Sequence, residues 1–261
     1  MTSKVLVLTG YGINCDIETQ HAFKIVGADA ERVHLTDLIS GDKKLADFHI
    51  LALPGGFSFG DDIASGKVLA NMIKYNLGED IREFINAGKL IIGICNGFQA
   101  MVKMGLLPAF DGDYATQDVT LTFNDSGRFE DRWVHLKSNK SSKCIFTKGI
   151  ENIYLPVRHG EGKFVAKNPQ VLARLKKNNH IVFQYVNNEG KFAGYPHNPN
   201  GSVENIAAIC DVTGRVFGMM PHPEAFQHRT NHPAWTREEL PEEGAGVAIF
   251  RNAVEYARER L

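Results

Sequence analysis

The sequence predicts an α/β fold, with a central, mostly parallel sheet flanked by helices and an antiparallel extension. In the first half, short continuous apolar runs end in glycine-bearing turns and are followed by segments with helical spacing. This alternation is typical of buried parallel strands joined by right-handed crossovers. From about residue 119 the apolar residues alternate at period two instead, which is typical of antiparallel strands.

The first strand and helix are expected at the start of the chain. Residues 4–10, KVLVLTG, form a continuous apolar run of the kind found in a buried strand. Residues 17–26 then carry apolar side chains at helical spacing, with Asn14 or Asp16 as the N-cap and Gly27 at the end.

Two further strands and two helices complete the predicted parallel half. HILALPGG (49–56) repeats the pattern of a strand followed by glycines, and IREFINAG (81–88) has the pattern of a short helix that ends at a glycine. KLIIGIC (89–95) is the next strand, and NGFQAMVKMG (96–105) is the helix that follows it.

The second half of the chain supplies the antiparallel extension. Strands are expected at residues 119–123, 133–137, 152–157, 181–186, 205–210 and 216–220. Residues 247–261 have the pattern of an amphipathic closing helix, and the polar stretch 225–246 has that of a surface loop. No Pro/Ser-rich linker separates the halves, so we expect a single domain over residues 1–261.

Composition and charge exclude several classes of protein. The chain has 261 residues, 43% of them apolar and 23% charged, which is ordinary for a globular protein. A formal net charge of −1 gives no electrostatic reason to expect a nucleic acid or an acidic membrane surface as partner. The apolar run at the start of the sequence is too short for a signal peptide or a membrane span. We therefore expect a cytoplasmic protein.

The four cysteines lie far apart in the sequence. They form no C-x-x-C pair and have no histidine at a zinc-binding spacing, so neither a disulfide framework nor a metal site is expected. Cys144 and Cys210 lie in apolar segments and are expected in the core. Cys15 and Cys95 lie in glycine-rich turns, where a thiol can be reactive.

GICNGFQ (93–99) places Cys95 between two glycines, after a strand and before a helix. A nucleophile on such a tight turn has little room beside it, which explains the flanking glycines. The free N–H groups and the dipole of the following helix favour the thiolate. On this pattern alone, a reactive cysteine and a core cysteine are about equally good interpretations.

PHPE (221–224) is a second motif that directly follows an expected strand. His222 and Glu224 are two residues apart, so in extended backbone they point to the same side. The carboxylate can then orient the imidazole and stabilise its protonated form. An incidental surface histidine is the alternative, but the position after a sheet strand favours the catalytic interpretation.

PGGFSFGDD (54–62) is the third motif, again at the end of a strand. The consecutive glycines Gly55 and Gly56 allow a backbone N–H to point into a site, and the N–H of Asn96 supplies a second donor. Two such donors form an oxyanion hole. A plain tight turn is the alternative. Residues 60–68 do not match a phosphate-binding loop. Five residues separate Gly60 from Gly66 where the loop requires four, and Lys67 is followed by Val68 in place of Ser or Thr.

Together, GICNGFQ, PGGFSFGDD, RHGEGKF (158–164) and GMMPHPE resemble the class I, triad-type glutamine amidotransferases. The resemblance extends over nearly the whole chain and implies a flavodoxin-like sheet. RFEDRW (128–133) and NGSVENIA (200–207) narrow it to the glutaminase subunits of phosphoribosylformylglycinamidine synthase, which acts in purine biosynthesis.

The resemblance implies a role for each motif. Cys95 would be the nucleophile, His222 the general base and acid, and Glu224 the residue that orients His222. The backbone of Gly56 or Phe57 would hold the oxyanion together with that of Asn96 (Gly55 belongs to the same turn).

The remaining site residues would bind the substrate, glutamine. The resemblance implies that Gln99, one turn into the helix, contacts it. The backbone of His159, Gly160 and Glu161 would clamp its amino-acid end. Arg128, Glu130 and Arg132 lie either near the site or the partner, or on a solvated strand, and the sequence favours neither.

The implied reaction releases ammonia and glutamate from glutamine through a γ-glutamyl thioester. The chain has no ATP-binding signature, so the family implies that ATP and Mg²⁺ are bound by a large synthetase subunit, with a small bridging subunit in the complex. No cofactor is expected in this chain. Residues 225–246 could be a lid, a partner contact or an inert insertion.

Three alternatives stay open on the sequence alone. The chain could serve GMP, CTP or cofactor synthesis, because those class I amidotransferases share the triad. It could be a non-catalytic, chaperone-like protein with a redox-sensing cysteine, although such proteins do not need the H-x-E motif. Cys15 could be the nucleophile, but it lacks the flanking glycines, and Asp16 would oppose a thiolate.

Overall fold

The computed structural model describes residues 2–261. Its strands are β1 (Lys4–Thr9), β2 (Asp29–His34), β3 (Ile50–Leu53), β4 (Leu90–Ile94), β5 (Val119–Thr122), β6 (Glu130–Ser138), β7 (Asn152–His159), β8 (Lys163–Ala166), β9 (Ile181–Val186), β10 (Ile206–Cys210) and β11 (Val216–Met219). Its α-helices are α1 (Asp16–Ile25), α2 (Leu35–Ser40), α3 (Lys67–Asn86), α4 (Asn96–Met104), α5 (Pro169–Lys177) and α6 (Val247–Arg260).

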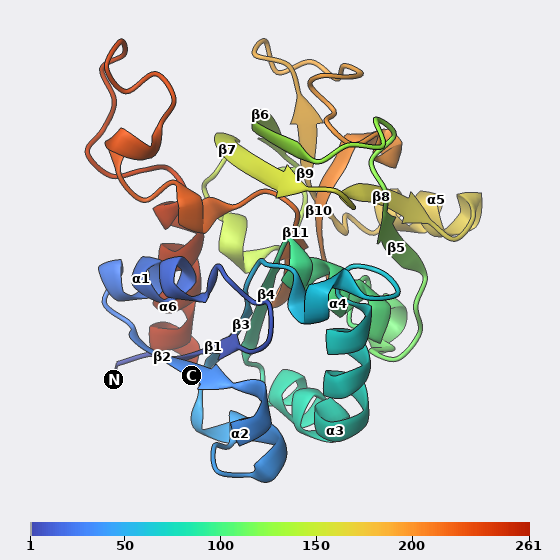
Figure 1. The fold of residues 1–261 in the computed structure, drawn as a ribbon, viewed down its shortest axis with the longest axis vertical. Coiled ribbons are helices and arrows are strands. Elements are labelled where there is room, and N and C mark those ends of the chain that lie inside the picture. Colours follow the sequence, from blue (N-terminus) through green and yellow to red (C-terminus); the bar gives the residue numbers. More distant parts are fainter. Residues whose placement is uncertain (1) are drawn as a thin grey trace.

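The main sheet has nine strands in the order β2-β1-β3-β4-β11-β10-β9-β6-β7 (Figure 1). The first five strands of this order run parallel to their neighbours. The other four are each antiparallel to the strand before them. The predicted fold class, a parallel sheet with an antiparallel extension, is confirmed. Two expected strands of the extension are exceptions. β5 (expected at 119–123) pairs with β8 in a separate two-stranded sheet, and β11 (expected at 216–220) runs parallel to β4 and so belongs to the parallel part.

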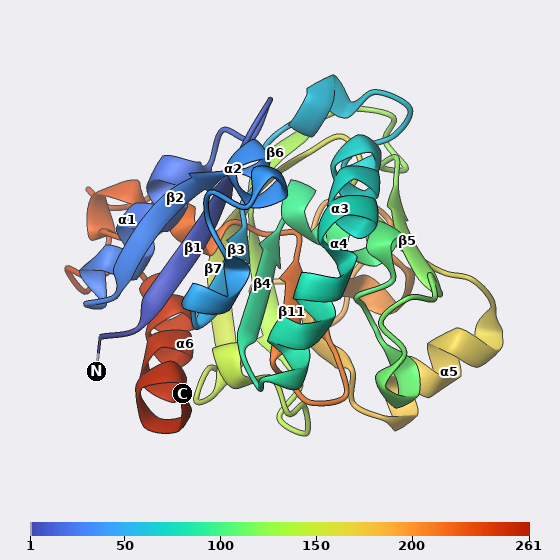
Figure 2. The same ribbon diagram turned by 90° about the horizontal axis from the view of Figure 1, so that it is seen from below.

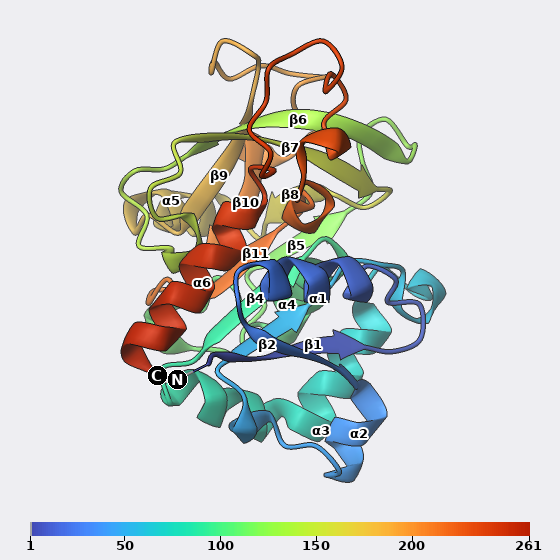
Figure 3. The ribbon, with the colours of Figure 1, turned by 90° about the vertical axis from the view of Figure 1, so that its left-hand side faces the viewer.

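Helices cover both faces of the parallel strands. Figure 2 shows α1 and α6 on one side of these strands, and α3 and α4 on the other. Phe250 of α6 meets Phe23 of α1 edge to face, with 4.9 Å between the ring centroids. The closing helix predicted at 247–261 is therefore confirmed, and the carbonyl of its Val254 accepts from Oγ of Ser3 at 3.2 Å, which ties α6 to the segment before β1 (Figure 3).

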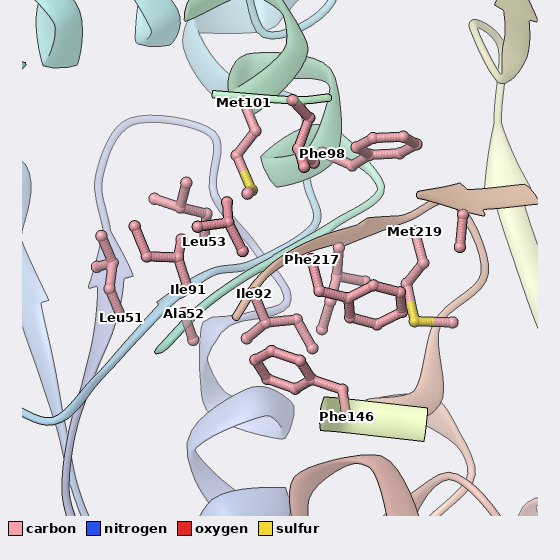
Figure 4. Packing of buried hydrophobic residues seen from close by; sticks show 14 of the residues in the cluster. Leu51, Ala52, Leu53, Ile91, Ile92, Phe98, Met101, Phe146, Phe217 and Met219 are labelled. Atoms are coloured by element: carbon pink, nitrogen blue, oxygen red, sulfur yellow. The ribbon is translucent and has the colours of Figure 1, made fainter. Parts of the chain in front are cut away.

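Helix α4 packs unusually close to the sheet, which fixes the position of the residue just before it. Gly93 and Gly218 face each other across β4 and β11, and a Cβ on them would lie 2.3 Å from Met101 Sδ and 2.1 Å from Phe98 Cδ2. A Cβ on Gly97 would lie 1.9 Å from the carbonyl oxygen of Leu53. Figure 4 shows Phe98 and Met101 lying on the strands, with Phe146 and Phe217 stacked on the opposite face.

Several elements differ from the sequence prediction. The short helix expected at 81–88 is the last part of α3, which begins at Lys67, because Leu69, Ile73 and Leu77 extend its buried stripe. Cys15 is the N-cap of α1, in place of Asn14 or Asp16. Four elements, β2, α2, α5 and β8, were not predicted, because β2 (DAERVH) is short and polar and the other three are also short. None of the helices described here is long and apolar enough to cross a membrane.

Candidate active site

Three neighbouring strands bring the predicted catalytic residues to one edge of the sheet. β3, β4 and β11 are adjacent and parallel, so their carboxyl ends lie together. Gly55, Cys95 and His222 follow these three ends within three residues. In open parallel sheets this edge is where ligands bind.

Cys95 adopts the strained backbone of a nucleophile elbow. Its φ is 48° and its ψ −104°, a combination that costs a side-chain-bearing residue on the order of 1–3 kcal/mol. Its N–H donates to the carbonyl of Met219 at 2.8 Å, which ties the turn to β11. Its thiol donates to the carbonyl of Arg158 at 3.6 Å, and α4 begins at the next residue.

His222 and Glu224 form a buried pair. Nδ1 of His222 lies 2.5 Å from Oε1 of Glu224, and both side chains are 2% exposed. The carboxylate therefore holds the proton on Nδ1, which leaves Nε2 free to exchange one with the nucleophile. In the described residues Nε2 has no hydrogen-bond partner.

The charge of Glu224 changes how His222 titrates. Burial lowers the pKa of His222, but Glu224, Cys95 and Cys15 together raise it well above the ordinary value. Gly55 lets the ring lie close to the backbone, since a Cβ there would be 2.7 Å from Cε1 of His222. The imidazole is thus both oriented and made more basic.

Gly56 and Asn96 have the free N–H groups that the predicted oxyanion hole requires. Among the described residues neither N–H donates a hydrogen bond, and Asn96 is the first residue of α4. Gly56 has φ +150°, and a Cβ on it would lie 2.5 Å from the carbonyl oxygen of Gly12. The N–H of the alternative donor, Phe57, instead donates to the carbonyl of Gly12 at 2.7 Å, which favours Gly56 as the donor.

The side chain of Asn96 ties the 57–65 loop to α4. Its Oδ1 accepts from the N–H of Ser58 at 3.2 Å, and its Nδ2 donates to Oδ1 of Asp61 at 3.2 Å. The same Nδ2 donates to Gln99 Oε1 at 3.0 Å. The sequence predicted a role only for the backbone N–H of Asn96. The structure shows that its side chain also positions the 57–65 loop.

Gln99 is buried at 3% exposure and does not line the cavity that contains Cys95. Its Nε2 donates to the carbonyl of Glu161 at 2.7 Å, and its Oε1 accepts from Asn96. The predicted contact with glutamine would require this amide to leave two protein partners. In this structure Gln99 instead fixes Glu161 relative to the elbow helix.

The predicted clamp residues follow β7. The side-chain amide of Asn124 donates to the carbonyl of His159 at 2.8 Å. The backbone N–H of Asn124 donates to the carbonyl of Gly160 at 2.9 Å. Since the carbonyl of Glu161 accepts from Gln99, only the N–H groups of Gly160 and Glu161 remain for a ligand. Asn124 was missed in the sequence, because it lies in a loop with no motif of its own.

A cavity of about 200 Å³ brings together Gly56, Cys95 and His222, whereas Glu224, Asn96, Gln99 and residues 159–161 are not part of its lining. Its lining is Asn14, Cys15, Glu18, Gly56, Phe57, Cys95, Phe129, Arg158 and His222. Phe57 thus contributes its side chain to the site. A larger cavity of about 790 Å³ adjoins it through Glu18 and Arg158, and the 225–246 segment forms one of its walls. Arg158 begins the RHGEGKF motif, but its side chain was not predicted in the site.

Cys15 lies closer to the catalytic pair than the sequence indicated. Its Sγ, a nitrogen of His222 and an oxygen of Glu224 lie within 4.8 Å of one another. Burial raises the pKa of Cys15, and Glu224 adds to the effect, so its thiol stays protonated. Its backbone is unstrained, with φ −100° and ψ 18°. Cys95, next to the free N–H of Asn96, has the better geometry for a nucleophile.

Comparison with known proteins identifies the family. The CobB/CobQ-like glutamine amidotransferase domain matches residues 2–257. The chain belongs to this glutamine amidotransferase family. It is 50% identical over 257 residues to phosphoribosylformylglycinamidine synthase subunit PurQ of Dehalococcoides mccartyi, with 98% of each chain covered. The PurQ subunit of Methanococcus maripaludis is 49% identical over 268 residues, with 98% of this chain and 99% of the relative covered.

Solved structures of glutamine amidotransferases agree with the fold. A chain in the structure of PurLQS from Thermotoga maritima is 31% identical, with a TM-score of 0.73 over 98% of this chain and 99% of that one. The Trypanosoma brucei CTPS glutaminase domain shares the fold at 15% identity and a TM-score of 0.54, over 97% and 94% of the two chains. Within the family, this chain therefore groups with the PurQ subunits.

Proposed function

We propose that this chain is the glutaminase subunit of phosphoribosylformylglycinamidine synthase. It hydrolyses glutamine to glutamate and ammonia for the amidation of formylglycinamide ribonucleotide. The observation that carries the proposal is the strained Cys95, which shares one cavity with His222, whose ring is held by the buried Glu224. The full-length similarity to PurQ subunits supports the substrate and the pathway.

The first half-reaction forms a thioester. His222 takes the thiol proton of Cys95 on Nε2, and the thiolate attacks the side-chain amide carbon of glutamine. The oxyanion that forms is stabilised by the N–H groups of Gly56 and Asn96. His222 then returns its proton to the amide nitrogen, the carbon–nitrogen bond breaks, and ammonia leaves.

The second half-reaction restores the enzyme. His222 removes a proton from water, and the hydroxide attacks the thioester carbon. The carbon–sulfur bond breaks, glutamate leaves, and Cys95 recovers its proton from His222. Glu224 stays ionised throughout and compensates the positive charge that the imidazole carries twice in each cycle.

The ammonia is used on another polypeptide. At neutral pH free ammonia is mostly ammonium, which is a poor nucleophile, so transfer without exposure to solvent favours a complex with a synthetase subunit. The PurLQS complex of Thermotoga maritima contains a chain similar to this one. In our proposal ATP and Mg²⁺ are bound by the synthetase, a small subunit bridges the two, and the complex is cytoplasmic.

Replacement of Cys95 tests this function. Cys95→Ser should abolish glutamine-dependent synthesis by the complex, because the hydroxyl is a far weaker nucleophile than the thiolate. Ammonia-dependent synthesis should be unchanged. The measurement is formation of formylglycinamidine ribonucleotide with either nitrogen donor.

Cys15→Ser is the matched variant, since both thiols line the same cavity. It should keep most of the glutamine-dependent activity. Loss of activity with Cys15→Ser but not with Cys95→Ser would reverse the assignment of the nucleophile. Loss of both activities in Cys95→Ser would indicate that the residue is structural.

A further inference from the structure

Two side chains of opposite charge, Arg158 and Glu18, lie where the catalytic cavity meets the larger one. Each lines both cavities, and the two side chains come from different elements, β7 and α1. Apart from His222, they are the only ionisable oxygen- or nitrogen-bearing groups among the residues that line the catalytic cavity. The cavity therefore presents one cation and one anion close to Cys95.

Neither charge is compensated within the part of the chain that the structure describes. Arg158 and Glu18 form no ion pair with each other or with another residue, and neither side chain makes a hydrogen bond. By contrast, Glu242 and Glu243, which line the larger cavity, pair with Arg229 and Arg251. An unpaired cation and anion beside a cavity are suited to a ligand that carries both charges.

The backbone fixes both residues relative to the nucleophile. The carbonyl of Arg158 accepts the thiol of Cys95 at 3.6 Å, so its side chain starts next to the reacting atom. Gln227 donates to the carbonyl of Glu18 at 2.8 Å and to that of Glu224 at 2.7 Å. Through Gln227, the 225–246 segment holds the first turn of α1 against the catalytic loop.

The dimensions of glutamine fit this placement. Four carbon–carbon bonds separate its amide carbon from its α-carboxylate carbon, a span of roughly 5 Å. With the amide carbon at Cys95, the α-carboxylate and α-ammonium groups fall within the same cavity that Arg158 and Glu18 line. A guanidinium binds a carboxylate through two parallel hydrogen bonds, and a carboxylate accepts from an ammonium.

We propose that Arg158 binds the α-carboxylate of glutamine and that Glu18 binds its α-ammonium group. This inference rests on the proposed glutaminase function and adds its specificity for a free α-amino acid. The N–H groups of Gly160 and Glu161 then act beside Arg158 as further donors to the carboxylate. A peptide-bound glutamine, which lacks both free charges, binds more weakly because it makes neither charged contact.

The test uses Arg158→Ala and Glu18→Gln in the full chain, assembled with its synthetase subunit. Each change should raise KM for glutamine about 10- to 100-fold, as expected for the loss of a hydrogen-bonded charge, with a much smaller effect on kcat. Arg158→Lys should recover part of the loss. Arg82→Ala is the matched control, because Arg82 is exposed on α3 and pairs with Glu79 there.

Two substrate analogues assign each residue to one end of glutamine. Glutaramate lacks the α-ammonium group and 4-aminobutanamide lacks the α-carboxylate, and both are measured as competitors of glutamine hydrolysis. Glu18→Gln should leave the inhibition constant of glutaramate unchanged, and Arg158→Ala should leave that of 4-aminobutanamide unchanged. Where an analogue does not compete even with the wild type, the KM changes for glutamine decide.

An unchanged KM in both variants, with Cys95-dependent ammonia release intact, overturns the inference and leaves the proposed function standing. The same holds if the variants lose affinity for the synthetase and regain normal KM at saturating synthetase, which would make the pair a partner contact. No ammonia release from glutamine by the wild-type complex would instead overturn the proposed function.

Discussion

At the scale of single residues, the site depends on how Glu224 and His222 share a proton. The two groups are buried at 2.5 Å, and the pKa of His222 is raised well above its ordinary value despite the opposing effect of burial. This state needs the negative charge of Glu224 and not merely a hydrogen-bond acceptor.

Glu224→Gln separates charge from shape. It should lower kcat for glutamine hydrolysis by about 10²- to 10⁴-fold and lower the pKa of His222, because the amide cannot stabilise the imidazolium. In the wild type, the pKa of His222 is higher in the folded state than in the unfolded state. Protonated His222 therefore stabilises the fold fully below about pH 6.5, and this stabilisation is lost as pH rises through the folded-state pKa.

The measurements are steady-state kinetics and denaturant titrations of both proteins between pH 6 and 9. The difference in unfolding free energy between wild type and variant should shrink as pH rises. A difference that stays constant with pH would contradict the assigned role of the carboxylate charge.

The sequence was informative about residues wherever a motif follows a strand. Cys95, His222, Glu224 and Gly56 could be placed because each follows an apolar run that forms a strand in the structure. Arg158 and Asn124 could not be placed from the sequence. Their positions near the site depend on how β7 and the loop that contains Asn124 fold back towards Cys95.

At the scale of elements, the position of α4 depends on glycines in two neighbouring strands. Gly93 and Gly218 leave the space that Met101 and Phe98 occupy. Because Cys95 lies between β4 and α4, any outward movement of the helix also moves the nucleophile and the N–H of Asn96.

Adding one methyl group tests this packing. Gly93→Ala or Gly218→Ala should destabilise the fold by about 1–3 kcal/mol, as overpacking does, and should reduce kcat as well. Thermal melting and glutaminase assays measure the two effects.

Gly78→Ala is the control for these variants. Gly78 lies within α3 with nothing within 4 Å of an added Cβ, so the change should stabilise the helix by about 0.5–1 kcal/mol. If Gly93→Ala were equally harmless, α4 would not depend on the close approach described above.

The elements were predicted well where the apolar pattern is continuous and poorly where it is short or polar. β2 carries Asp, Glu and Arg in six residues because it lies at the edge of the sheet, and α5 buries only Leu175. Such segments gain their structure from tertiary contacts more than from local preference.

At the scale of the whole molecule, a buried uncharged histidine links folding to pH. Burial, with a further effect of the His222 charge, lowers the pKa of His159 to about 3. Its Nδ1 lies 3.1 Å from Oδ1 of Asn124, which fits a neutral ring that donates from this nitrogen.

In the unfolded chain, His159 becomes protonated near pH 6.5, whereas in the folded chain it stays neutral. His159 should therefore destabilise the fold increasingly as pH falls below 6.5. His159→Gln should therefore gain stability relative to the wild type between pH 6.5 and 4, by about 1.4 kcal/mol per pH unit at most. Urea titrations across this range measure it, and parallel curves for the two proteins would refute the prediction.

The arrangement of the antiparallel half was beyond the sequence. All its strands except β8 were predicted, but the spatial order β10-β9-β6-β7 differs from the order along the chain, and β5 leaves the main sheet. Pairings between segments so far apart depend on which partner buries each face, and no local pattern specifies that.

The hydrogen bond from the N–H of His222 to the carbonyl of Pro156, at 2.8 Å, connects the end of a parallel strand to the outermost antiparallel one. The catalytic base is thereby attached to both halves of the chain. Partial opening of either half would remove a support of the imidazole, so hydrolysis of glutamine would stop at once. The amide hydrogen of His222 should accordingly be among the slowest to exchange with solvent deuterium, since its release requires these two halves to separate.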